Sequence, residues 1–320
     1  MLDPLLSTHL APFILTSSLA TPGERTALQQ RVSRGDLVTV MRGVHLPREH
    51  WVELDGAGRH RALVTACSLV AGGSLVFSHH SAAALWQLPW VGEWPSRAHV
   101  TDPPGRRVRS GNFLMRHNPT RPLAHVRIDG LAVTDLSRTV IDLAAVLPFA
   151  AAVVVADAAL RRHRHPKHPL PEHHATRTSL LGEVARLPPS QGSVKALRVA
   201  EFADGRAQLP GESLSRVNMH AAALPAPILQ QRLRGASGRA YFVDFWWPTA
   251  NLIGEFDGDA KYTDPEYLQG RTPAQVLRDE KAREDDLRAA GYRFSRWRWN
   301  TAVSPARLRR HLVRAGLRAQ

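Results

Sequence analysis

The strongest hydrophobic pattern lies in the last third of the chain, where two apolar runs, 241–247 and 252–256, flank a short turn that contains proline and asparagine. Runs of this length around such a turn predict a β-hairpin. Asp244 interrupts the first run, and Glu255 and Asp257 close the second with a spacing of two. Period-two alternation directs these last two side chains to one face of the strand. The facing strand would then bring Asp244 beside them.

Three carboxylates in an apolar hairpin predict a site that compensates negative charge. Burying an unpaired carboxylate is costly, and neighbouring carboxylates repel one another unless a cation binds or a proton is shared. Oxygen ligands with room for water suit Mg²⁺, which can activate a water and neutralise the charge that builds on a phosphodiester. The alternative is structural: Asp244 would cap or pair within the sheet, and the Asp257-Gly258 pair would end the strand in a turn.

Near the N-terminus the pattern predicts a capped helix followed by a hairpin. Thr21 can cap a helix whose first residue is proline, with Glu24 at the third position, and Gly35 ends the helical pattern. Two short β-rich pieces follow and turn at Arg42. A helix followed by a basic hairpin is the order of a winged helix. The alternative is a small packing module without a ligand, because a fold alone does not fix function.

Short strands and helices alternate in the middle region, about 60–162. We expect helices to begin at Ser78 or Ser81 and at Asp135 or Ser137, each before apolar residues at helical spacing. This alternation predicts a mixed α/β domain.

Two histidine-bearing stretches are interpreted as structural. His79 and His80 stand at a helix entry without a nearby nucleophile motif, so a structural role is favoured over a catalytic one. The stretch 161–174 has five histidines and three prolines at irregular spacings and no cysteine. We therefore interpret it as a polar linker and the main domain boundary, in preference to a metal site.

Beyond the hairpin, the pattern predicts a helix over 276–290 that stops at Gly291. A strand over 292–299 follows, and its apolar residues on both faces place it centrally in a sheet covered on two sides. On such a strand Arg296 or Arg298 needs an anionic partner. The chain then ends in a helix capped by a Ser-Pro pair. Its arginines share one face, which would follow a phosphate backbone or simply be solvated: Arg307, Arg310, Arg314 and Arg318.

Length and charge narrow the class of protein. A chain of 320 residues exceeds the usual size of one core, so two or three domains are expected. The formal net charge of +14 and a pI near 11.1 favour a polyanionic partner, either nucleic acid or an anionic membrane surface. The single cysteine excludes an intramolecular disulfide. The N-terminus lacks a basic n-region, and the longest apolar run, 143–156, is too short to span a bilayer. We expect a soluble cytoplasmic protein without membrane association.

The spacing Asp244, ten residues, Glu255, one residue, Asp257 resembles the core of PD-(D/E)XK nucleases, in the form of the very-short-patch-repair (Vsr)-like endonucleases. The resemblance runs from about 210 to the C-terminus and implies a restriction-endonuclease-like α/β/α fold. It adds a glutamate from an earlier helix to the site. The general motif has lysine two residues after the acid, where this chain has aspartate, so the lysine role is vacant or falls to a later lysine. The implied catalytic set is Glu212, Asp244, Glu255, Asp257, Lys261 and Lys281.

Motifs of the first half resemble the abortive-infection AbiEi-type antitoxin family over roughly residues 10–160. They are RGDLVTVMRGVHLP, FSHHSAAALWQLP, HVTDP and LAVTDLSRTVIDLAA. This resemblance implies a winged helix that binds operator DNA and a possible cognate toxin protein.

Together these patterns predict an α/β (α+β) protein: a winged-helix-like domain at 1–58, an AbiEi-like α/β domain at 59–165, a linker with connecting helices at 166–205, and a Vsr-like endonuclease-type domain at 206–320 with a central mixed sheet. The expected function is DNA binding with Mg²⁺-dependent phosphodiester hydrolysis, linked to defence or toxin–antitoxin systems. The alternative is a catalytically inactive antitoxin or regulator that uses the nuclease fold to bind DNA or a toxin. The expected metal ligands are Glu212, Asp244 and Glu255. The expected nucleic-acid contacts are Arg42, Arg283, Arg296, Arg298, Arg307, Arg310 and Arg314.

Overall fold

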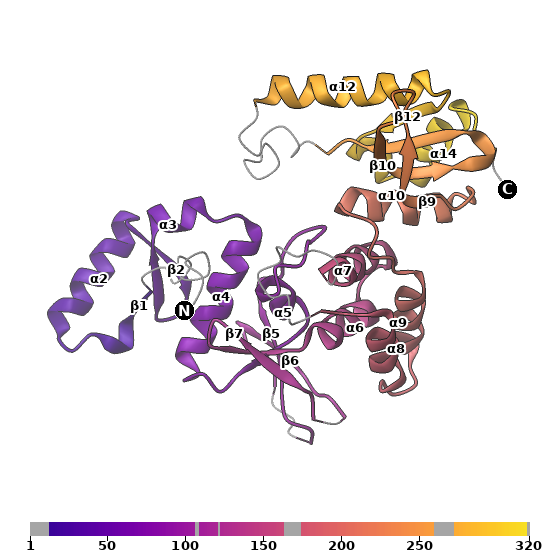
Figure 1. The fold of residues 1–320 in the computed structure, drawn as a ribbon. Helices are drawn as coiled ribbons and strands as arrows, with labels where there is room; N and C mark the ends of the chain where they lie inside the picture. The colour runs from indigo at the N-terminus through magenta and orange to yellow at the C-terminus, as the bar shows by residue number, and fades with distance from the viewer. Residues whose placement is uncertain (1–12, 106–108, 121, 163–173, 259–271, 319–320) are drawn as a thin grey trace. The chain divides into compact units, whose positions relative to one another are not determined.

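The structure, a computed structural model, describes residues 13–105, 109–120, 122–162, 174–258 and 272–318 (Figure 1). These residues form two compact units, unit 1 within 1–147 and 172–201 and unit 2 within 148–171 and 202–320. Each unit combines helices with a sheet that contains both parallel and antiparallel strand pairs. The predicted α/β class is therefore confirmed. None of the described helices is long and apolar enough to cross a membrane.

Unit 1 begins with the predicted helix and hairpin. Thr21 starts α2 in a capping box with Glu24, and Gly35 ends the helix with φ 83°, in the left-handed region that favours glycine. Three antiparallel strands follow the order β1-β3-β2, and Arg42 is exposed at the hairpin turn. The elements of this part are β1 (Ile14–Leu15), η1 (Thr16–Ser18), α2 (Pro22–Arg34), β2 (Leu37–Met41), β3 (Val44–Pro47), α3 (Arg48–Glu53) and α4 (Gly56–Val70).

The rest of unit 1 is a five-stranded sheet with helices packed against it. Strand order is β6-β5-β4-β8-β7. Helix α5 packs against β5, α4 and α6, and its Trp86 cap residue donates an indole hydrogen bond to the Thr134 carbonyl at 3.0 Å. Asp135 caps α6; it is one of the two residues predicted as the start of this helix. The elements are β4 (Val76–Phe77), α5 (His79–Leu85), β5 (Ala98–Thr101), β6 (Leu114–His117), β7 (His125–Ile128), β8 (Leu131–Thr134), α6 (Leu136–Val146), α8 (Arg177–Ala185) and α9 (Gln191–Phe202).

Unit 2 is a four-stranded sheet with helices on both faces. The predicted hairpin is present, with Phe245 paired to Gly254 and Trp247 to Leu252. One core cluster joins the sheet to α10 and α14 and another joins it to α12, and Figure 1 shows α12 and α10 on opposite sides of the strands. The elements are α7 (Phe149–Arg162), α10 (Pro210–Ala221), β9 (Ile228–Arg234), β10 (Ala240–Trp247), η2 (Pro248–Ala250), β11 (Leu252–Phe256), α12 (Pro273–Ala289), β12 (Arg293–Trp297), α13 (Trp299–Ala302) and α14 (Pro305–Arg314).

The strand predicted at 292–299 lies at an edge of the sheet and not at its centre. Among the described strands the order is β12-β11-β10-β9, so β12 pairs only with β11, in parallel. The prediction that both faces are covered is correct, because Trp297 packs on the α10 side and Phe294 on the α12 side. Burial on two faces shows that helices cover a strand, but it does not show whether the strand has one neighbour or two.

Helix α7 belongs to a different unit from the one that the sequence predicts. The sequence assigns residues 59–165 to one domain, whereas α7 packs against α10 and belongs to unit 2. Most of the predicted linker at 161–174 lies outside the described residues.

Candidate carboxylate site of unit 2

Two glycines let the candidate carboxylates approach the core of unit 2. A Cβ at Gly211 would lie 2.1 Å from the buried ring of Phe256, so only glycine lets the first turn of α10 rest on that ring. A Cβ at Gly254 would lie 2.7 Å from Trp297. Helix α10 therefore begins against the end of β11, and Glu212, the next residue, is buried there.

Glu212 and Asp244 converge on one amide. Gln230 Nε2 lies 3.3 Å from Glu212 Oε2 and 3.2 Å from Asp244 Oδ1, so it donates to both carboxylates. Glu212 Oε2 also accepts the backbone N–H of Gln208 at 2.8 Å. Asp244 Oδ2 accepts the backbone N–H of Phe256 at 3.0 Å. Hydrogen bonds from these neutral donors thus help to stabilise both charges, and the charge of Arg161 also acts on Glu212.

A local irregularity in β9 and β10 places these side chains. Gln230 has φ 49°, a conformation that residues with side chains rarely adopt, and Gln230 and Asp244 are the two positions, one on each strand, missing from the otherwise continuous register. Val243 packs in the cluster with Leu287 of α12, whereas Phe245 packs in the cluster on the α10 side. The alternation of faces therefore slips by one residue at Asp244. Strained backbone of this kind is often found at functional sites.

Glu255 and Asp257 form a second group of carboxylates, which pairs with arginine side chains. Glu255 Oε1 lies 2.7 Å from Arg283 Nη2, and its Oε2 lies 3.0 Å from Arg296 Nη2. Arg296 also pairs with Asp257 at 3.6 Å and with Glu284 at 2.9 Å. Burial alone would lower the pKa of Arg296, but these carboxylates outweigh burial and raise that pKa. The predicted common face of the two acids and the predicted anionic partner of Arg296 are both present.

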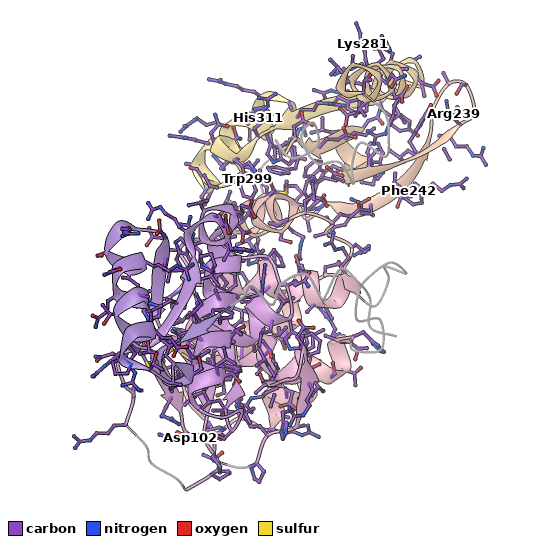
Figure 2. The ribbon with its side chains drawn as sticks, turned by 90° about the vertical axis from the view of Figure 1, so that its left-hand side faces the viewer. Asp102, Arg239, Phe242, Lys281, Trp299 and His311 are labelled. Atoms are coloured by element: carbon purple, nitrogen blue, oxygen red, sulfur yellow. The ribbon has the colours of Figure 1, made fainter. Side chains whose placement is uncertain are left out.

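Lys281, one of the two lysines proposed for catalysis, is not found beside the carboxylates. Lys281 is exposed on α12, at the outer surface of unit 2 (Figure 2), and in the described part of the chain it forms no hydrogen bond or ion pair with them. Lys261 lies outside the described residues. The role of a phosphate-polarising cation is therefore not filled by Lys281 in this arrangement.

Magnesium does not fit the carboxylates as they are arranged. Glu212 and Asp244 share the Gln230 amide, while Glu255 lies between two guanidinium groups. Among the described residues no group of three or more His, Cys, Asp or Glu side chains is arranged to hold a metal ion. A cation at Glu255 would have to displace both arginines.

Two proteins of Mycobacterium tuberculosis, the uncharacterized proteins MT2308 and Rv2248, are each 32% identical to the chain over 296 residues, which is 91% of this chain and 98% of theirs. The chain belongs to their family. No family model matches the sequence. The crystal structure of the RV2827C protein from the same species covers 62% of this chain and 74% of its own with a TM-score of 0.37 and 13% identity. That likeness is too distant to show a shared fold.

The arginines predicted to contact DNA divide into two groups. Arg283 and Arg296 are engaged by Glu255, and Arg283 also donates to the Phe242 carbonyl. The others are exposed and make no ion pair with another described residue: Arg42, Arg298, Arg307, Arg310 and Arg314. Only this second group is available to a phosphate backbone without breaking an ion pair seen in the structure.

The residue that joins two of the carboxylates, Gln230, is not among the predicted site residues. Gln230 stands in β9, a strand that was not predicted although ILQQRLR at 228–234 carries three apolar residues among polar ones. The signal that could have found it is a strand pattern immediately before the hairpin, because sequential strands usually pair.

Proposed function

We propose that the protein binds duplex DNA, and that the carboxylates of unit 2 stabilise this unit rather than bind magnesium. The observation that carries the proposal is the division of the arginines. Those next to the carboxylates form ion pairs, whereas those on α14 form none with another described residue. Arginines that the fold leaves exposed can pair with phosphates in bidentate geometry.

Helix α14 has the form expected of a phosphate-contacting element. Leu308 and Leu312 are buried on one side, and Arg307, Arg310 and Arg314 are exposed on the other. The helix contains no acidic residue, so nothing within it opposes a polyanion. A net charge of +14 on the whole chain would also attract DNA from a distance.

We expect the double variant Arg310→Ala, Arg314→Ala to bind duplex DNA more weakly, to a similar degree for every sequence tested. Each lost phosphate contact reduces the slope of log K against log salt by about 0.9, so the slope should fall by about 2 if both arginines contact phosphates. Fluorescence anisotropy of a labelled duplex, titrated across a range of salt concentrations, measures the slope.

The matched control is Arg288→Ala on α12. Arg288 is also exposed but pairs with Glu284 at 2.7 Å, so this substitution removes one positive charge from an arginine that is already engaged. An unchanged slope in the double variant would remove α14 from the DNA interface. A loss in the single control that is half of the loss in the double variant would show that only overall charge matters.

Metal-dependent phosphodiester hydrolysis is a second candidate, favoured by one observation. Glu212 and Asp244 approach the same amide of Gln230, where the Vsr resemblance expects metal ligands. This candidate requires Gln230 and the two arginines at Glu255 to give way to a cation. A cognate toxin stays a prediction of the antitoxin resemblance in either case.

The variant Asp244→Asn separates the two candidates. Under our proposal it lowers the stability of unit 2 by about 1–3 kcal/mol, because Asp244 accepts charge-assisted hydrogen bonds from Gln230 and Phe256, and magnesium leaves the Tm of both proteins unchanged. A magnesium site instead predicts that the ion raises the wild-type Tm by mass action, and that the variant loses both this rise and any DNA nicking. Melting curves and plasmid nicking, each with and without Mg²⁺, decide between them. The control is Asp285→Asn, an equal charge change at an exposed position on α12.

A further inference from the structure

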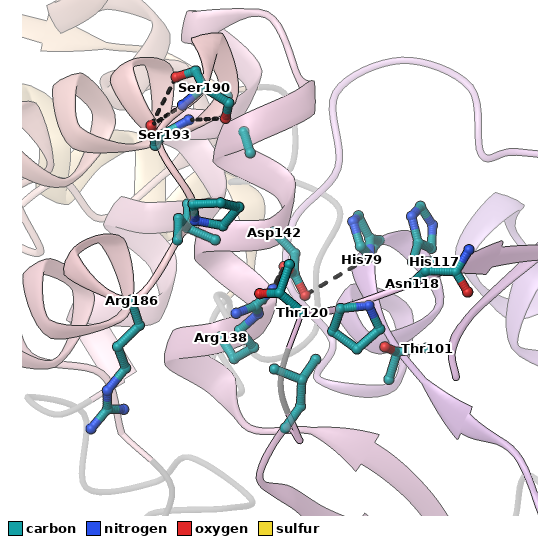
Figure 3. Close-up of a pocket in the computed structure, with 16 residues that line it drawn as sticks. His79, Thr101, His117, Asn118, Thr120, Arg138, Asp142, Arg186, Ser190 and Ser193 are labelled. Atoms are coloured by element: carbon teal, nitrogen blue, oxygen red, sulfur yellow. Dashed lines mark hydrogen bonds and ion pairs between the residues drawn. The ribbon is translucent and has the colours of Figure 1, made fainter. Parts of the chain in front are cut away.

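A cavity of about 240 Å³ opens within unit 1 (Figure 3). Its walls come from α5, β5, β6 and α6 on one side and from the segment that joins α8 to α9 on the other. The proposed DNA-binding function uses none of these residues. The cavity is smaller than the pockets of drug-sized ligands, which measure about 300–1,000 Å³, so it suits a small polar molecule.

Two buried polar atoms in the cavity wall lack hydrogen-bond partners among the described residues. Asp142 Oδ1 accepts from Arg138 Nε at 2.8 Å, but Asp142 Oδ2 accepts from no donor, although this side chain is only 5% exposed. Thr101 Oγ1 is likewise without a partner, in a residue 9% exposed. Folded proteins leave few such atoms unpaired. Two of them on one cavity indicate that a hydrogen-bonding group completes this wall.

The neighbouring histidine does not supply that group. His79 Nδ1 lies 3.9 Å from Asp142 Oδ2, beyond hydrogen-bond distance. Burial, together with the charges of neighbouring histidines, holds the pKa of His79 well below its usual value, so the ring is neutral. Its ring stacks on His117 at 3.6 Å, and its backbone has φ 49°, an uncommon conformation for a residue with a side chain. Among the described residues, the unpaired oxygen of Asp142 therefore meets no cation on the side of His79.

The opposite wall contains a guanidinium group and the start of a helix. Arg186 lines the cavity with a side chain that is 59% exposed, and it pairs with Glu183 at 2.5 Å. The start of α9, a helix of 12 residues, lines the same wall through Ser190, Gly192 and Ser193. The N-terminus of a helix favours an anionic group. The cavity thus has an acceptor at one end and an anion-binding end at the other.

We propose that this cavity binds the zwitterion of a small α-amino acid. The ammonium group would donate to Asp142 and Thr101, and the carboxylate would accept from Arg186 and from the first turn of α9. The charged side chains that line the cavity support a ligand that carries both charges, because Asp142 offers an unpaired acceptor and Arg186 offers guanidinium donors. An amine alone would make no use of Arg186 and the start of α9, and an anion alone would leave the Asp142 oxygen unpaired.

The first test titrates the full chain with each of the twenty L-amino acids by calorimetry and by thermal shift. We expect at least one amino acid to bind with a stoichiometry of one and to raise the Tm, while methylamine and acetate at the same concentration do neither. Binding of inorganic phosphate in place of amino acids would overturn the proposal. Failure of all twenty to bind would also overturn it, and would leave water as the partner of the two atoms.

The second test uses Thr101→Val, which keeps the shape of the side chain and removes only the hydroxyl. Because this hydroxyl has no partner among the described residues, the free variant should fold with unchanged stability, and its affinity for the amino acid should fall at least tenfold. The matched control is Thr65→Val on α4, outside the cavity, where the hydroxyl donates to the Arg61 carbonyl at 3.0 Å. We expect wild-type affinity in the control. Wild-type affinity in Thr101→Val would overturn the assignment of the ammonium end.

Discussion

Lowering the pH from 7 to 5 should destabilise unit 1 by several kcal/mol, because a cluster of histidines would have to gain protons. The cluster joins four elements, and its rings pack on one another: His79 lies 3.6 Å from His117, and His80 lies 4.5 Å from His99, between ring centroids. His60, on α4, lies next to these rings, and its Nε2 forms a hydrogen bond with Ser81 Oγ at 3.1 Å. Protonating any of these rings places a charge in an apolar surrounding next to other rings of the same kind.

The pKa values of the histidines decide whether the stability of unit 1 rises or falls with pH. Burial is the main cause that lowers the pKa of His60, His80 and His117 to about 4, and that of His99 to about 3, from the usual 6.5. Above pH 6.5 these rings are neutral in both the folded and the unfolded chain. Between pH 6.5 and about 4 the unfolded chain binds protons that the folded chain does not, so stability falls as the pH falls. At pH 5 this amounts to at most about 2 kcal/mol per histidine, at 1.36 kcal/mol per pKa unit.

Two groups act in the opposite sense. Burial raises the pKa of Asp142 to about 6 and also raises the pKa of Asp135, so on lowering the pH the folded state binds protons there before the unfolded state does. This gain comes from two carboxylates and offsets only part of the loss from the histidines.

Cys67 gives a local measurement of this effect. It is the only cysteine of the chain, it lies on α4 in unit 1, and it is 3% exposed. The urea concentration at which it becomes reactive toward a disulfide reagent that works in acid therefore reports the unfolding of unit 1. We expect this midpoint to be clearly lower at pH 5 than at pH 7. Equal midpoints would contradict the histidine argument.

A single substitution tests whether the histidines cause the effect. His80 Nδ1 has no hydrogen-bond partner among the described residues, and its ring contacts Trp90 edge-on at 4.8 Å. His80→Phe keeps an aromatic ring and removes one titrating group, so it should raise the stability at pH 5 by more than at pH 7. His125→Gln, at an exposed position on β7, should leave the pH dependence unchanged.

The histidine cluster also shows where prediction from the sequence ends. The sequence placed His79 and His80 at a helix entry and favoured a structural role, which follows from local pattern alone. The rings of His99 and His117 reach them because β5 and β6 are paired in the sheet, with Thr101 opposite His117. Strand pairing is a long-range property, so the cluster could not be derived from spacing along the chain.

The carboxylate site shows the same difference between local features, which the sequence predicts, and long-range contacts, which it does not. The capping box at Thr21 and the hairpin around Asp244 depend on residues close in sequence, and both are found as predicted. The need of Arg296 for an anion was also predictable, because a guanidinium on a buried strand must be compensated. Glu255 is this anion, and it pairs with Arg283 of α12 as well as with Arg296. That arrangement depends on how α12 packs on the sheet, which the local sequence does not show.

Arg216→Ala should destabilise unit 2 by about 3–5 kcal/mol, because it leaves a buried carboxylate without its counter-charge. Arg216 Nη2 lies 2.9 Å from both oxygens of Asp157, whose side chain is 1% exposed. The backbone N–H of Asp204 donates to Asp157 at 2.7 Å, but a neutral donor does not replace the lost charge. The matched control is Arg206→Ala: Arg206 pairs with Asp204 at 2.6 Å with a side chain that is 45% exposed, and the cost there should be about 1 kcal/mol or less.

This pair links α7 to α10, so it also bears on how the chain can be divided. A fragment that begins after the stretch 161–174 would lack α7 and would leave Arg216 without Asp157. We expect such a fragment to be less stable than unit 2 in the full chain. Urea unfolding followed by tryptophan fluorescence compares the two.

The charge origin of the effect is tested by removing both partners. The double variant Asp157→Asn, Arg216→Met eliminates both charges and keeps an oxygen to accept from Asp204, so it should recover most of the stability that Arg216→Ala loses. Burial already raises the pKa of Asp157, and loss of Arg216 should raise it further, so the deficit of Arg216→Ala should shrink as the pH falls from 7 to 5. This trend is opposite to that of unit 1, which Cys67 reports separately. A deficit that is independent of pH would assign the loss to packing instead, since the Arg216 guanidinium also lies 4.3 Å from the Phe202 ring centre.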